Sequence, residues 1–96
     1  MRRETVIEAV SSHAKDLARF DVRSLSLFGS VARDKASEES DVDMLVSFAG
    51  AATFDHYMGL KFFLEDLLGR RVDLVTDRAL RQELRSRIER EASHVA

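Results

Sequence analysis

The sequence predicts an α/β fold, with one small mixed β-sheet and helices packed on one face of it. Segments with apolar residues at helical spacing alternate along the chain with short segments in which every second residue is apolar. The composition is 45% hydrophobic and 33% charged, with no proline, which is typical of a helix-rich globular protein. A chain of 96 residues can bury one modest core, so we expect a single domain over residues 1–96.

Composition also excludes several classes of protein. No apolar run approaches the roughly 20 residues that a membrane helix needs, and no apolar segment follows the basic first residues as in a secretory signal. The absence of cysteine excludes disulfides, thiolate catalysis and cysteine-based metal sites. A formal net charge of −2 disfavours non-specific DNA binding, which needs a basic surface. We therefore expect a cytoplasmic protein that binds neither membranes nor DNA non-specifically.

The first half of the chain predicts a helix, a strand and a short second helix. Apolar residues recur at three- and four-residue spacing between Glu4 and Phe20, which predicts an amphipathic helix. These residues are Val6, Ile7, Val10, Ala14, Leu17 and Ala18. A strand over Arg23–Phe28 ends at the turn Gly29-Ser30, where Ser30 can cap a short helix over Val31–Lys35.

The second half predicts two more strands, each followed by a helix. Asp41–Phe48 alternates and predicts a strand, and Thr53 then caps a helix that extends to Leu68. Its apolar positions are Phe54, Tyr57, Met58, Phe62, Leu64, Leu67 and Leu68, and the pair Phe62-Phe63 is expected in the core. A third strand covers Arg71–Thr76, and Asp77 caps a last helix. The apolar stripe of that helix is Leu80, Leu84 and Ile88.

Three acidic residues are predicted on the sheet face that the helices leave open. Because strand side chains alternate between faces, an apolar row in the second strand places Asp41 and Asp43 together on the opposite face. The apolar row is Val42, Met44, Val46 and Phe48. Asp73 lies between two apolar residues of the third strand, and it joins the other acids if its apolar neighbours also face the helices. The alternative for Asp73 is a salt bridge to Arg70, Arg71 or Arg78.

Neighbouring carboxylates repel each other unless a cation lies between them. Magnesium prefers hard carboxylate oxygens, with water and phosphate oxygens at its remaining positions. Three carboxylates on adjacent strands therefore suit a two-metal phosphoryl-transfer site.

The turn Gly29-Ser30 is a candidate phosphate-binding element. Glycine allows a phosphate to approach the backbone, the following helix start offers free N–H groups, and Ser30 adds a hydroxyl donor. The alternative is an ordinary turn with a helix cap. Arg33 either contacts phosphate or forms a salt bridge with Asp34 or Glu38.

The spacing of these pieces resembles the DNA-polymerase-β-like nucleotidyltransferases. Their signature is Gly-Ser, ten residues, Asp-x-Asp, and a third acid on a later strand; here it is Gly29-Ser30, residues 31–40, Asp41-Val42-Asp43 and Asp73. Length and element order resemble the minimal nucleotidyltransferase (MNT) branch over nearly the whole chain. One departure is Val31, since many relatives have arginine after the Gly-Ser.

The resemblance implies a polymerase-β-like fold and a role for each motif residue. Asp41 and Asp43 would bind the metal ions, two Mg²⁺, that hold the nucleoside triphosphate. Asp73 would help to bind the metal at the acceptor hydroxyl and favour its deprotonation. Gly29-Ser30 would contact the β- and γ-phosphates, with Arg33 as a further nucleotide-binding residue.

The resemblance also implies a partner. MNT proteins are often antitoxins of HEPN-type RNase toxins, and characterised members transfer AMP from ATP to a tyrosine of that toxin. A metal-dependent protein adenylyltransferase that acts as an antitoxin is therefore the leading interpretation. One alternative is a catalytically inert MNT-fold antitoxin that neutralises its partner by binding alone. Another is the catalytic piece of a small-molecule or RNA nucleotidyltransferase whose other part is a separate chain.

Overall fold

The protein is built on a mixed sheet, as the sequence predicts. The computed structural model describes residues 2–32, 41–50, 53–77, 86, 88, 90 and 93–95. Within them the strands are β1 (Val22–Phe28), β2 (Val42–Phe48), β3 (Val72–Thr76) and β4 (Ser93–His94), in the spatial order β3-β2-β1-β4. β2 is parallel to β3, whereas β1 is antiparallel to both β2 and β4. The short strand β4 was not expected from the sequence.

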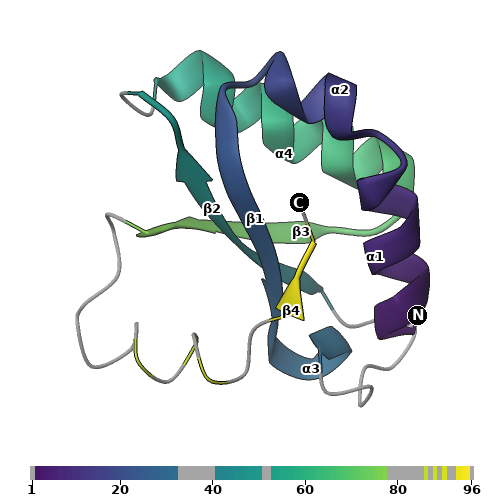
Figure 1. Ribbon diagram of the computed structural model, residues 1–96. Coiled ribbons are helices and arrows are strands. Elements are labelled where there is room, and N and C mark those ends of the chain that lie inside the picture. Colours follow the sequence, from purple (N-terminus) through teal and green to yellow (C-terminus); the bar gives the residue numbers. More distant parts are fainter. Residues whose placement is uncertain are drawn as a thin grey trace.

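Helices cover one side of this sheet. These are α1 (Arg3–Ser11), α2 (Ala14–Ala18) and α4 (Phe54–Leu68), and the short helix α3 (Gly29–Ala32) follows β1 directly. Figure 1 shows α1, α2 and α4 on the same side, with α3 at the end of β1, which confirms the predicted architecture. None of the helices in the described ranges has the length and apolar character needed to cross a membrane. Of the predicted last helix, Ile88 is helical, whereas Leu80 and Leu84 lie outside the described residues.

The N-terminal helix is interrupted, so the prediction of one helix over Glu4–Phe20 was wrong. Two side chains bond to backbone carbonyls at the break: the Ser12 hydroxyl donates to Glu8 O at 2.7 Å, and His13 Nδ1 lies 2.8 Å from Ala9 O. The backbone N–H of His13 donates to Val10 O, three residues back, which tightens the last turn of α1. Local bonds of this kind compete with helix continuation and are invisible to apolar periodicity. The change of direction leaves Ala14 and Ala18 exposed.

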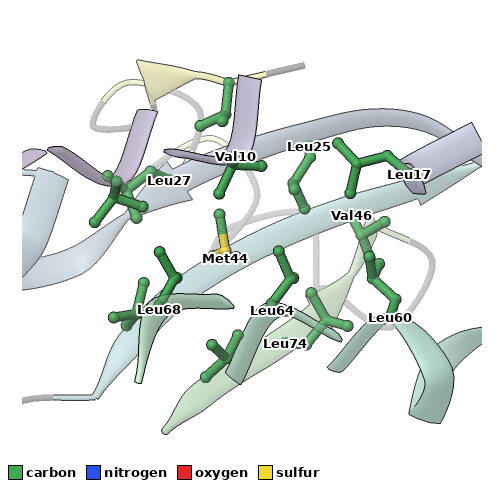
Figure 2. Packing of buried hydrophobic residues seen from close by; sticks show 14 of the residues in the cluster. Val10, Leu17, Leu25, Leu27, Met44, Val46, Leu60, Leu64, Leu68 and Leu74 are labelled. Atoms are coloured by element: carbon green, nitrogen blue, oxygen red, sulfur yellow. The ribbon is translucent and has the colours of Figure 1, made fainter. Parts of the chain in front are cut away.

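The core lies between the sheet and the helices (Figure 2). The predicted apolar row of β2 is confirmed, since Val42, Met44, Val46 and Phe48 are all buried. This row packs with buried residues of the neighbouring strands and helices: Val6, Val10, Leu25, Leu27, Leu60, Leu64, Leu68, Val72 and Leu74. Burial of this face fixes which face of the sheet remains for polar groups.

The ends of α4 are as predicted, whereas one of its faces is not. The Thr53 hydroxyl accepts the N–H of His56 at 3.1 Å, and Gly69 ends the helix in the left-handed conformation with φ of 65°. Phe62 was expected in the core, but 59% of it is exposed, and Phe54, another apolar position of the helix, is 75% exposed. The helix is apolar on several sides, so spacing alone could not identify the side that contacts the sheet.

Candidate functional site

The site begins in a row of residues that crosses three strands. Phe28 is the register partner of Asp43 across the antiparallel pair β1–β2, and Asp43 is the partner of Asp73 across the parallel pair β2–β3. Neighbouring strands lie about 4.8 Å apart, so the backbones of the two acids are adjacent. Their neighbours Val42 and Val72 are buried, which places Asp43 and Asp73 on the opposite, open face as predicted.

The turn after β1 lies directly against Asp43. Gly29 has φ of 75°, a conformation that side-chain-bearing residues rarely adopt. A methyl group at Gly29 would overlap the Asp43 carboxylate and would lie 3.0 Å from its Cγ. Glycine is therefore required here for two reasons, the backbone conformation and the proximity of the carboxylate. Ser30 follows, half-buried, at the start of α3, while Val31 turns into the core with 1% exposure.

The remaining acid of the motif, Asp41, is exposed and precedes β2. The N–H of Val42 donates to Arg71 O at 2.9 Å, which joins the starts of β2 and β3. Asp41 and Asp73 consequently line the same pocket, of ≈330 Å³. Within the described residues, no three His, Asp or Glu side chains converge closely enough to hold a metal ion. Asp43 and Asp73 are thus paired on the open face and Asp41 shares a pocket with Asp73, but the three carboxylates do not meet at a single point.

Two side chains of α4 hold the backbone on either side of Asp73. Glu65 Oε2 accepts the N–H of Val72 at 3.0 Å, and the Tyr57 hydroxyl donates to Leu74 O at 2.5 Å. These bonds satisfy polar groups of β3, the strand at the end of the sheet order. The sequence did not predict these bonds, because it indicated Tyr57 only as an apolar position of the helix and gave no signal for Glu65.

The other sequence predictions at this site have mixed outcomes. In the described part of the chain, no ion pair joins Asp73 to Arg70 or Arg71, and Arg78 lies outside it. Arg33 also lies outside the described residues, so its nucleotide contact stays a prediction. The pocket adds residues that the motif did not indicate, namely Lys61, Phe62 and Glu65 of α4.

Comparison with known proteins identifies the family. A family model described as a nucleotidyltransferase domain matches residues 4–95. The chain belongs to this family. This nucleotidyltransferase domain is 39% identical to the protein adenylyltransferase MntA of Thermococcus cleftensis over 93 residues. The aligned residues cover 96% of this chain and 94% of the relative.

Solved structures agree with this assignment. A structure that bears the name minimal nucleotidyltransferase is 42% identical, with a TM-score of 0.83 over 97% of this chain and 95% of that one. An MNT antitoxin in complex with a tri-AMPylated HEPN toxin, from Shewanella oneidensis, is 19% identical, with a TM-score of 0.70 over 98% of this chain and 71% of that one. At that identity the likeness concerns the fold alone. The resemblance of this nucleotidyltransferase to the MNT branch is confirmed.

Proposed function

We propose that this nucleotidyltransferase transfers AMP from ATP to a hydroxyl group of a partner protein, a tyrosine of a HEPN toxin, and so acts as its antitoxin. The observation that supports this most directly is the register row of Phe28, Asp43 and Asp73 on three strands, with the Gly29 turn directly after Phe28 and against Asp43. The adenylyltransferase relative supports the choice of AMP and of a protein acceptor. The Shewanella oneidensis complex, with its AMPylated HEPN toxin, supports the choice of partner.

The reaction is an exchange of one phosphoester bond for another. The acceptor oxygen attacks the α-phosphorus of ATP, the bond from that phosphorus to the bridging oxygen breaks, and pyrophosphate leaves. The hydroxyl proton is lost to Asp73 or to water next to it. Little covalent chemistry is required of the protein, so its contribution is to position the reactants and stabilise charge.

The acids fit a role in holding Mg²⁺ with the nucleotide. Their oxygens are the hard ligands that Mg²⁺ prefers, and one or two carboxylates plus phosphates are its usual protein environment. Asp41 and Asp43 would hold the ions with the triphosphate, and Asp73 would hold the acceptor side. The bound ions would neutralise charge on the triphosphate and on the attacking oxygen. The Gly29 turn and the Ser30 hydroxyl, together with Arg33, would contact the phosphates that leave.

The test is transfer of label from α-³²P-ATP with Mg²⁺ to a purified HEPN protein, the partner class proposed above. We expect the parent to label that protein and to suppress its RNase activity. Asp43→Asn should abolish labelling while the protein remains folded, because it removes a ligand charge from an exposed face. Asp55→Asn, in the first turn of α4, is the matched control and should label normally.

The alternatives give different results in the same assay. An inert antitoxin would suppress the RNase without label, and its Asp43→Asn variant would suppress it equally well. A small-molecule or RNA nucleotidyltransferase would label generic hydroxyl acceptors faster than the HEPN protein. Either result would replace the proposed function.

A further inference from the structure

An exposed aromatic residue of α4 lies beside the edge strand β3, in one pocket with Asp41 and Asp73. The stripe Leu60, Leu64 and Leu68 turns α4 toward the core, whereas Phe62 lies outside that stripe with 59% of its surface exposed. A large exposed aromatic side chain is a common feature of protein interaction sites, where it supplies apolar area at low entropic cost. Phe54 is even more exposed, at 75%, but it lines neither of the two hollows around Phe62.

Phe62 lines the same pocket as the acids. The ≈330 Å³ pocket has Asp41, Arg71, Val72 and Asp73 on its strand side and Lys61, Phe62 and Glu65 on its α4 side. The bonds from Glu65 to Val72 N and from Tyr57 to Leu74 O keep α4 beside the strand that bears Asp73. The volume is at the lower end of the range for ligand pockets, about 300–1,000 Å³, and suits a large side chain better than a whole nucleotide.

The order of the strands places this pocket and the phosphate turn on opposite sides of Asp43. Gly29 follows β1, which flanks β2 on one side, and the pocket adjoins β3, which flanks β2 on the other. An in-line displacement needs the attacking and leaving oxygens on opposite sides of the phosphorus. With the leaving phosphates at the Gly29 turn, the attacking hydroxyl would approach from the pocket.

The surface beyond Phe62 has a definite charge. A second, shallower hollow is lined by Phe62, Phe63, Glu65 and Asp66, so it is apolar and acidic. A peptide segment that starts at the pocket beside Asp73 and passes over Phe62 would therefore reach the carboxylates of Glu65 and Asp66. Complementary charge at this position is basic.

We propose that α4 forms the acceptor-docking surface, with Phe62 as its anchor, for a segment of the acceptor protein that presents a hydroxyl residue at the pocket beside Asp73. The segment packs an apolar side chain on Phe62 and places a basic side chain next to Glu65 and Asp66. This inference rests on the proposed function and adds to it the surface that positions the protein substrate.

The decisive comparison is between two exposed phenylalanines of the same helix. Phe62→Ala should raise the KM for the HEPN acceptor and weaken its binding about 30-fold, the effect of losing an interface hot spot of about 2 kcal/mol. Phe54→Ala, the matched control, should change neither quantity by more than about twofold. Both variants should keep the parent's affinity for Mg-ATP and its melting temperature, because neither ring is buried. Asp66→Lys should weaken acceptor binding as well, and stronger binding would contradict the predicted charge of the segment.

Binding and transfer are measured separately, so the two proposals can fail separately. Weaker acceptor binding by Phe62→Ala with no transfer by the parent would refute the proposed function and leave the docking surface supported. Normal transfer by Phe62→Ala would refute the docking surface alone.

Loss of Mg-ATP binding in Phe62→Ala would instead indicate that the ring stacks on the nucleotide base. Loss of a dimer, seen by light scattering, would indicate that a second copy of this chain covers the ring. Either of these results would overturn the docking proposal, as would failure of the parent to bind the HEPN protein.

Discussion

Replacement of Gly29 by alanine should separate the role of this glycine in folding from its role in the site. Gly29 and Gly69 both have left-handed backbones, with φ of 75° and 65°, so alanine incurs about 1–2 kcal/mol of backbone strain at either position. Reduced entropy of the unfolded chain offsets about 0.4–1 kcal/mol of that cost. Nothing lies within 4 Å of a methyl group at Gly69, whereas one at Gly29 overlaps the Asp43 carboxylate.

The two variants should therefore differ more in activity than in stability. Each should lose roughly 1 kcal/mol, which corresponds to about 4–8 °C in melting temperature for a domain of this size. Gly29→Ala should lose up to about 1.5 kcal/mol more if Asp43 is forced out of its preferred rotamer. Rotation of the carboxylate would clear the overlap with Oδ2, but the new methyl group would still lie in a tight contact of 3.1 Å with the Asp43 Cβ.

Displacement of the Asp43 carboxylate by about 1 Å should lower the transfer rate roughly 100-fold. Urea unfolding followed by circular dichroism gives the stability of both variants, and label transfer from ATP gives their rates. Gly69→Ala should transfer at close to the parent rate once both are compared under conditions where they are fully folded. Equal transfer rates for the two variants would refute the claim that the Gly29 turn determines the position of Asp43.

Three further substitutions test other parts of the structure. Ser30→Ala should lower kcat/KM for ATP by the equivalent of roughly 1.5–3 kcal/mol, while acceptor binding is kept. If KM and kcat for ATP are both unchanged, Ser30 has only a structural role. Tyr57→Phe removes the hydroxyl that donates to Leu74 O, so it should lower the free energy of unfolding by about 0.5–1.5 kcal/mol. It should also slow AMP transfer, because the backbone next to Asp73 is held less firmly. An unchanged urea unfolding curve would contradict the hydrogen bond. Leu64→Ala should cost about 2–5 kcal/mol because the side chain is fully buried, and a loss below 1 kcal/mol would show that the core can refill the space.

Local patterns in the sequence predicted the elements well where a single rule applied. The alternation in Val42–Phe48 places four of its five apolar residues on one face, and that face is buried. The Thr53 cap and the Gly69 stop depend on backbone groups within a few residues, so the bounds of α4 were correct. The break at Ser12-His13 was missed because it depends on side-chain bonds to the backbone that residue type alone does not reveal.

Contacts between distant segments could not be predicted in the same way. The outward position of Phe62 depends on which stripe of α4 meets the sheet, and the sequence of α4 offers more than one apolar stripe. The short strand β4 has only two residues, too few for a periodic pattern. It is defined by its pairing with Ser26 and Leu27 of β1, next to the bond from Val95 N to Leu25 O. The pocket that joins α4 to the acids depends on the strand order, which is a property of the whole fold.

The position of the acids is itself a consequence of the core. Val42 is the register partner of Val72, and both are buried against the helices, so the next pair along, Asp43 and Asp73, must lie on the other face. A slip of one residue in β3 would turn Asp73 toward the core and expose Val72. An isolated carboxylate in that core would cost many kcal/mol or would have to take up a proton. Burial of two valines therefore fixes which carboxylates stand side by side, and the acids need no attraction of their own to be brought together.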